Sequence, residues 1–188
     1  MNRTERIEIL ARQNKRKRTL PVLHERLNCV LGYELPEEAI WSEGEAENAT
    51  ERLWESWRNT NISGAPKLSL KHLPEDYVVA NRKLFVDFSN KIYEQEFVLY
   101  LSFGAGVHFS GRWCVSLGTD AFSHVEGLAE LENKAFYVSS RNFDNYFLLD
   151  LHMLYFWSGD CRLVWELEVW GAQWGEIAHA VFAPKTEP

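Results

Sequence analysis

A group of acidic side chains with one histidine is the part of the sequence best suited to chemistry. Its members are Asp144, Asp150, His152, Asp160, Glu166 and Glu168. A carboxylate beside an imidazole raises the pKa of that imidazole and can make it a general acid or base. Because the spacing matches no established catalytic motif, a polar surface facing solvent explains these residues better than catalysis does.

The sequence contains no other catalytic or metal-binding motif. It has no dinucleotide or P-loop glycine pattern, no HExxH and no GxSxG, and neither Glu166 nor Glu168 is followed two residues later by the lysine of a Glu-x-Lys nuclease. The six histidines are far apart, and Cys29, Cys114 and Cys161 form no CxxC pair. We therefore expect no enzyme activity, no metal, no cofactor and no disulfide framework.

Charge is distributed unevenly along the chain. Residues 1–34 contain eight Lys/Arg and four Asp/Glu, whereas residues 35–188 contain twelve and twenty-three, so the net charges are +4 and −11. A cationic cluster able to contact nucleic acid phosphates comprises Arg12, Lys15, Arg16, Lys17 and Arg18. Because the acidic remainder would repel the same phosphates, contact with solvent or with that remainder is the simpler interpretation of the cluster.

The composition is typical of a soluble globular domain. Of 188 residues, 46% are hydrophobic and 25% are charged, and no run of 18 apolar residues provides a transmembrane helix. No apolar segment follows the charged N-terminus, so we expect no secretory signal peptide and a cytoplasmic location. Eight tryptophans are many for this length, and we expect most of them in the core and some at a partner surface.

Helices are predicted for the N-terminal third. A first helix spans 3–17 with Asn2 as its N-cap, and a second begins at Pro21 and stops at Gly32. A Ser42–Glu45 capping box precedes a third helix over 46–58, whose inward face comprises Ala46, Ala49, Leu53 and Trp57. The rest of that helix offers a candidate partner surface formed by Glu43, Glu45, Glu47, Glu51, Trp54 and Glu55.

Strands are predicted for the remainder, after a linker at 59–66. The expected strands lie at 83–88, 97–103, 112–117, 135–138, 147–157, 163–170 and 178–182. The short turns between several of them favour a meandering, mostly antiparallel sheet with a long C-terminal hairpin. The predicted class is α+β, with a helical part at 1–60 and a sheet part at 61–188 that together form one domain.

The alternation of apolar and polar residues in 147–157 and 163–170 predicts the parity of the hairpin, that is, whether odd-numbered positions of one strand pair with odd-numbered or even-numbered positions of the other. Odd-numbered positions are apolar in both strands, so a loop of odd length that pairs odd with odd gives one apolar and one polar face. We expect His152 to lie opposite Glu168. The polar face, exposed to solvent, would carry a second candidate partner surface formed by Asp150, His152, Glu166, Glu168 and Trp170.

These observations predict a small acidic protein that binds another protein. Carboxylates would attract a cationic surface, and aromatic side chains would supply desolvated contacts. In this general character the chain resembles bacterial immunity proteins, which neutralise cationic, nuclease-like toxin domains, and the resemblance implies an inhibitor of such a toxin. The alternative hypothesis is a nucleic-acid-associated or regulatory adaptor that acts through the basic N-terminal helix. An enzyme whose site is dispersed along the sequence is the third.

Overall fold

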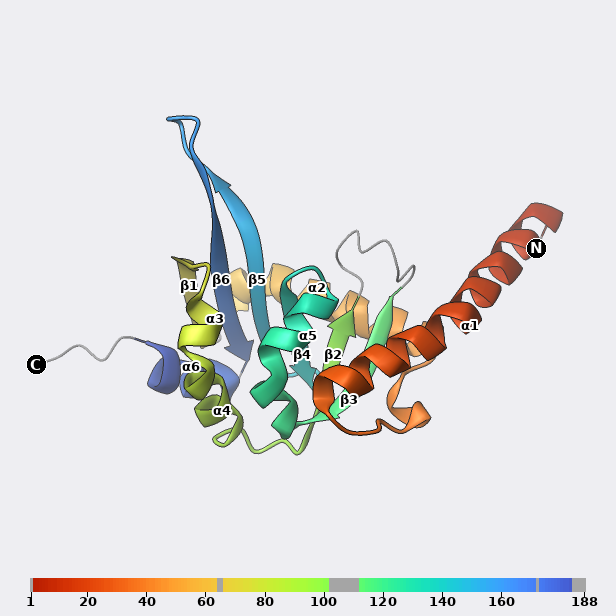
Figure 1. Ribbon diagram of the computed structural model, residues 1–188, viewed down its shortest axis with the longest axis horizontal. Coiled ribbons are helices and arrows are strands. Elements are labelled where there is room, and N and C mark those ends of the chain that lie inside the picture. The colour runs from red at the N-terminus through yellow and green to blue at the C-terminus, as the bar shows by residue number, and fades with distance from the viewer. Residues whose placement is uncertain (1, 64–65, 102–111, 172, 184–188) are drawn as a thin grey trace, which may run out of the picture.

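A six-stranded antiparallel sheet organises the part of the chain that the computed structural model describes, residues 2–63, 66–101, 112–171 and 173–183. The strands lie in the order β1-β6-β5-β4-β2-β3 (Figure 1). Their bounds are β1 (Lys67–Pro74), β2 (Glu96–Leu101), β3 (Trp113–Gly118), β4 (Ala135–Ser140), β5 (Asn145–Tyr155) and β6 (Cys161–Gly171). With helices first and the sheet after them, the fold is α+β, as predicted.

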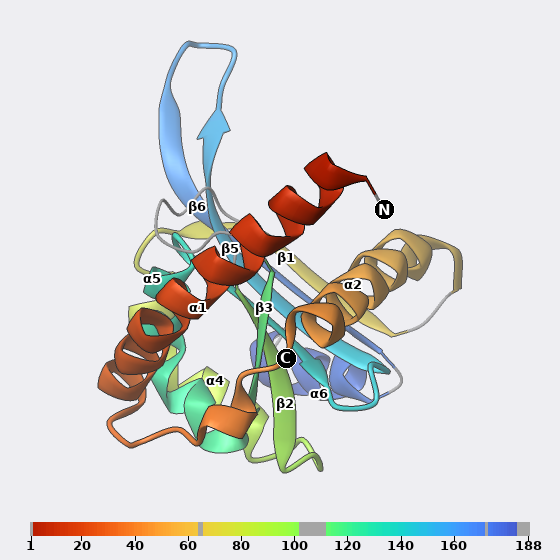
Figure 2. The same cartoon turned by 90° about the vertical axis from the view of Figure 1, so that its right-hand side faces the viewer.

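Helices cover both faces of this sheet, and Figure 2 shows α2 on the side opposite α1, α4 and α5. The helices are α1 (Arg3–Leu31), α2 (Glu43–Ser63), α3 (Tyr77–Ala80), α4 (Arg82–Ser89), α5 (Val125–Leu131) and α6 (Trp174–Phe182), with 3-10 turns at Glu37–Ala39 and Thr119–His124. A large core lies under α1, α4, α5 and α6. A smaller core under α2 contains Ala46, Ala49 and Leu53. Even-numbered residues of the hairpin therefore face a helix near its base, and the prediction that they face solvent is wrong there.

The N-terminal segment is one helix, not the predicted two, and it runs through Pro21. Proline inside a helix removes one hydrogen bond and costs about 3 kcal/mol. Burial of Leu23, Leu27 and Leu31 against the large core offsets this cost and holds the second half of the helix in place. The predicted ends are confirmed, since Asn2 and Glu5 form a capping box and Gly32 closes the helix at a φ of 75°.

Two short apolar runs predicted as strands are helices, α4 at 83–88 and α6 at 178–182. Apolar runs of this length fit both the helical and the strand period, so packing decides which element forms. Phe85, Phe88 and Phe182 meet in the large core, with ring centroids 5.4 and 5.6 Å from Phe182. Strand β1 was not predicted. Helix α2 continues to Ser63 into the predicted linker, and positions 102 and 103 of the strand predicted at 97–103 lie outside the described residues.

The hairpin has the predicted parity but a different register. Tyr155 pairs with Cys161 and Leu151 with Trp165, so odd positions face odd positions. His152 lies opposite Val164, and Glu168 opposite Leu148, so the predicted His152–Glu168 pair is wrong. The reason is Gly159, whose φ of 88° suits the third position of a three-residue loop. The three-residue loop is therefore centred on Ser158, and the partner of each β5 residue lies four residues earlier in β6 than predicted.

Candidate functional site

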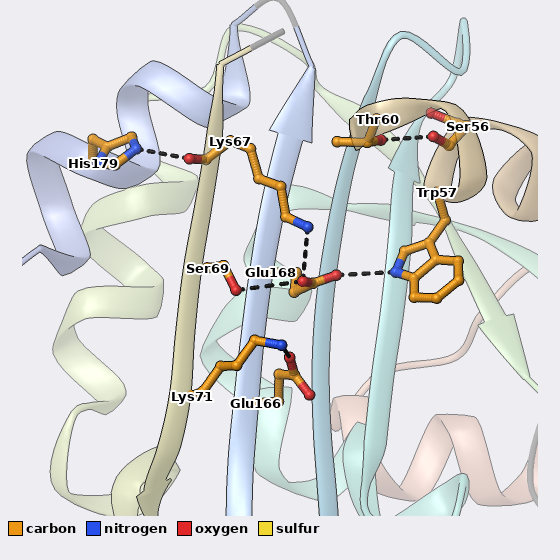
Figure 3. Close-up of polar contacts among 9 residues, drawn as sticks. All are labelled: Ser56, Trp57, Thr60, Lys67, Ser69, Lys71, Glu166, Glu168 and His179. Atoms are coloured by element: carbon orange, nitrogen blue, oxygen red, sulfur yellow. Dashed lines mark hydrogen bonds and ion pairs between the residues drawn. The ribbon is translucent and has the colours of Figure 1, made fainter. Parts of the chain in front are cut away.

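A groove between the C-terminal half of α2 and the sheet is the candidate site. Its volume is about 380 Å³. It is lined by Trp54, Trp57, Lys71, Tyr137, Leu148, Asp150, Glu166 and Glu168. The structure thus joins Trp54, from the surface predicted on α2, with the three carboxylates of the surface predicted on the hairpin. Figure 3 shows the contacts of Trp57, Lys71 and the two glutamates in this region.

Two tryptophans of α2 form the helical wall of the groove. The rings of Trp54 and Trp57 lie edge to face, with centroids 6.1 Å apart and planes at 89°. Trp57 donates a hydrogen bond from Nε1 to Oε2 of Glu168 at 3.0 Å, and 44% of its surface remains exposed (Figure 3). Because the indole N–H is satisfied by the protein, the exposed part of this ring is available for an apolar or cation–π contact.

Lysines of β1 neutralise both glutamates of β6. Lys67 Nζ lies 2.9 Å from Glu168 Oε1, and Lys71 Nζ lies 2.9 Å from Glu166 Oε1 (Figure 3). Glu168 is buried, with 8% of its surface exposed, and Ser69 Oγ donates to it at 3.4 Å. These pairs make the groove less negative than the sequence suggested, and they leave Asp150 as its distinctive carboxylate.

Asp150 is partly buried, and the ion pairs of the described residues do not include it. Burial raises the pKa of its carboxyl group above the usual value, although a hydrogen bond from the Tyr137 hydroxyl and the nearby His152 act in the opposite direction. The pKa of Tyr137 is also raised, chiefly by burial. A carboxylate that is partly buried and outside these ion pairs is suited to accept a positively charged side chain from another molecule.

The remaining predicted residues do not line this groove. Trp170 is buried under α2, stacked on Tyr146 with centroids 5.1 Å apart, and its Nε1 donates to Ser56 Oγ at 2.9 Å. His152 lies further out along the hairpin and is half-buried. Of the acidic residues predicted as a partner surface on α2, Glu45, Glu47, Glu51 and Glu55 are exposed and Glu43 is half-buried.

The basic N-terminal cluster is divided by the structure. Arg12, Lys15, Lys17 and Arg18 are exposed. Arg16 instead lies against the sheet, where its guanidinium is 3.7 Å from the Trp113 ring centroid and donates to the carbonyls of Arg112 at 2.9 Å and Trp41 at 2.7 Å. Burial lowers the pKa of Arg16. Arg16 therefore positions α1, and the cluster that could contact phosphates lacks it.

Sequence reasoning missed half of the groove. Trp57 was assigned to the inward face of α2, Tyr137 to an ordinary strand, and Lys71 lies on the strand that was not predicted. The i, i+3 spacing of Trp54 and Trp57 could have shown that they lie side by side on the helix. Nothing in the sequence could have placed Tyr137 beside Asp150, because that contact depends on the pairing of β4 with β5.

No match was found when the chain was compared with protein-family models, with curated proteins and with solved structures. Among the described residues, no helix combines the length and apolar character needed to cross a membrane. The same part of the chain brings no three His, Cys, Asp or Glu side chains into a metal-binding arrangement. Cys29, Cys114 and Cys161 are free, and burial raises the pKa of Cys114 to about 12.

Proposed function

We propose that the chain binds another protein by accepting a basic segment of that protein in the groove between α2 and the sheet. In the narrower form of this proposal, it is an immunity-type inhibitor of a cationic, nuclease-like toxin domain. The observation that carries the proposal is that Asp150, which takes part in none of the ion pairs of the described residues, lines the same groove as Trp54 and Trp57.

The chemistry of the groove fits an arginine or lysine of a partner. An aromatic face attracts a cation by about 0.5–2 kcal/mol, and a carboxylate in a partly desolvated position adds a charge-assisted hydrogen bond. Tryptophan is among the residues most often found at binding hot spots. The exposed Glu47, Glu51 and Glu55 on α2 would attract the same partner over a longer distance and increase its association rate.

The partial burial of Asp150 also supports a binding role. A carboxylate whose pKa is raised by burial destabilises the folded protein at neutral pH. Binding sites commonly keep such costs because removing them would remove the function. Glu166 and Glu168 pair with lysines, so their positions need no such functional explanation.

The test uses purified cationic nuclease domains as probes, with binding measured by calorimetry and inhibition measured by nucleic acid cleavage. We expect at least one domain to be bound and inhibited, with affinity that falls as salt is raised. Asp150→Asn and Trp54→Ala should each weaken binding at least tenfold, or about 1.4 kcal/mol.

Two matched variants control for surface changes outside the groove. Asp76→Asn removes an exposed carboxylate, and Tyr93→Ala removes an exposed ring, 84% of which is accessible. Both should bind as the unmodified chain does. Binding that is unaffected by the two groove variants would contradict the proposed site. Binding without loss of nuclease activity would contradict the inhibitor role alone.

A further inference from the structure

The outer half of the β5–β6 hairpin projects beyond the sheet as an isolated two-stranded ribbon (Figures 1 and 2). We define this ribbon as residues 151–163. Strand β1 pairs with β6 as far as Val164, and β4 pairs with β5 as far as Asp150, with one further main-chain bond from Leu151 N to Lys134 O at 3.0 Å. Beyond these points the two strands pair with each other, and among the described residues no further strand flanks them.

Both edges of the ribbon carry outward-directed main-chain groups. Phe156 N donates to Asp160 O at 2.9 Å across the ribbon, which fixes the alternation of inward and outward groups in both strands. It follows that Met153 and Tyr155 in β5, and Cys161 and Leu163 in β6, direct their N–H and C=O groups outward. An open edge of this kind is a template for pairing with another strand.

The ribbon also exposes large apolar side chains. The exposed fractions are Met153 45%, Tyr155 75%, Phe156 40%, Trp157 108% and Leu163 36%. At roughly 150–250 Å² for an aromatic side chain, these residues present on the order of 500 Å². A standard interface buries about 800 Å² per partner, so this surface together with the strand edges approaches what a stable dimer needs. Such a patch on a projecting element marks an interaction site.

The charges of the ribbon are compatible with a second copy of the chain. The chain carries a net charge of −7, which opposes the approach of two copies. The ribbon, however, contains one carboxylate, Asp160, and one guanidinium, that of Arg162, together with His152; the Arg162 guanidinium carbon lies 5.3 Å from the centroid of the Phe156 ring. A two-fold axis between two ribbons can place Asp160 of each copy beside Arg162 of the other.

We propose that two copies of this chain associate through ribbon 151–163, by pairing an open strand edge and packing the exposed aromatic side chains across a two-fold axis. The projection of the ribbon keeps the acidic bodies apart. None of its residues lines the groove assigned to partner binding, so this inference is independent of the proposed function.

Sedimentation equilibrium and light scattering between 1 and 100 µM test the proposal. The monomer mass is 21.9 kDa, and we expect a mass about twofold higher at the upper concentrations. Trp157→Ser removes the most exposed ring, and Met153→Pro removes an outward N–H while leaving the hydrogen bonds inside the ribbon intact. Each variant should raise the dimer dissociation constant at least tenfold.

Tyr93→Ser is the matched control, because Tyr93 is 84% exposed and lies outside the ribbon. It should dimerise as the unmodified chain does. Thermal melting of every variant checks that the fold is retained. If Met153→Pro lowers the melting temperature, the dimer dissociation constant of Trp157→Ser alone tests the proposal. A monomer at all concentrations, or a dimer unaffected by Trp157→Ser, would overturn the proposal. So would a monomer whose ribbon binds phosphatidylcholine vesicles, since the apolar surface would then serve a membrane.

Discussion

At the scale of single residues, Asp150 links the stability of the protein to its proposed function. Burial makes the charged carboxylate unfavourable, and none of the ion pairs of the described residues includes it. The folded protein therefore binds the Asp150 proton more tightly than the unfolded chain does. This favours folding below the ordinary carboxyl pKa, and the benefit is lost as the pH rises through the pKa of the folded state.

The first prediction concerns the pH dependence of Asp150→Asn. At pH 7 the variant should be more stable than the unmodified chain, because asparagine still accepts from Tyr137 and carries no buried charge. Below about pH 4 the gain should vanish, since Asp150 is then protonated. Unfolding in urea at pH 4, 5, 6 and 7 measures the difference, and Asp76→Asn corrects for net charge. A gain that does not grow with pH would contradict the assignment.

The second prediction concerns Arg16. Its guanidinium stacks on Trp113 and donates two hydrogen bonds to main-chain carbonyls. Arg16→Ala should lower the free energy of unfolding by about 2 kcal/mol. Arg16→Lys should restore little, because a lysine cannot reproduce the planar fork. Chemical denaturation provides the measurement, and Arg12→Ala, at an exposed position of the same helix, should have no effect. Equal losses for Arg12 and Arg16 would show that Arg16 acts only through charge.

At the scale of elements, α2 determines how much of the hairpin is available to a partner. Its small side chains at Ala46 and Ala49 lie fully buried, so the helix approaches the sheet closely and covers Trp170 and Glu168. The capping box of Ser42 and Glu45, with Ser42 N 3.0 Å from Glu45 Oε2, begins this helix as predicted. The C-terminal half carries Trp54 and Trp57 and leaves space beside β5 and β6, and the groove lies there.

The third prediction follows from this close approach. Ala49→Leu should cost about 1–3 kcal/mol of stability, because a larger side chain in a filled core displaces the helix. Asn48→Leu adds the same side chain at the neighbouring exposed position and should change stability by less than about 0.5 kcal/mol. Thermal and urea unfolding compare the two. A tolerated leucine at 49 would mean that α2 packs more loosely than the structure indicates.

At the scale of the whole molecule, a two-sided core surrounds the sheet while two elements extend away from it. One is the ribbon at 151–163, and the other is the N-terminal half of α1 (Figure 1). The buried residues of α1 begin at Thr19, and Ile7 and Leu10 are 57% and 49% exposed. Most of the stability should therefore come from the sheet and the helices that cover it.

The fourth prediction separates these parts of α1. Deleting residues 2–12 should change the free energy of unfolding by no more than about 1 kcal/mol, because those residues bury little surface. Leu27→Ala should lower it by about 2–5 kcal/mol, because this side chain is fully buried in the large core. Urea denaturation measures both. A large loss from the deletion would show that the exposed half of α1 contributes to the core.

The sequence by itself determined the local features of this protein. Capping at Asn2 and Ser42, the stop at Gly32, the α+β class and the odd parity of the hairpin all follow from neighbouring residues or from side-chain period, and the structure confirms them. The caps depend on interactions within a few residues, and the class and the parity depend on side-chain period along the chain, so all of them can be recognised without knowing what packs above each element.

Only the tertiary structure decided which residues are covered and which meet. The same alternation runs through Phe147, Met153 and Trp157, yet their exposed fractions are 0%, 45% and 108%, because the neighbouring strands end before the ribbon does. Likewise, Trp170 is buried and Trp54 reaches the groove because α2 crosses one face of the sheet. Burial depends on distant elements, and the period of a single strand carries no information about them.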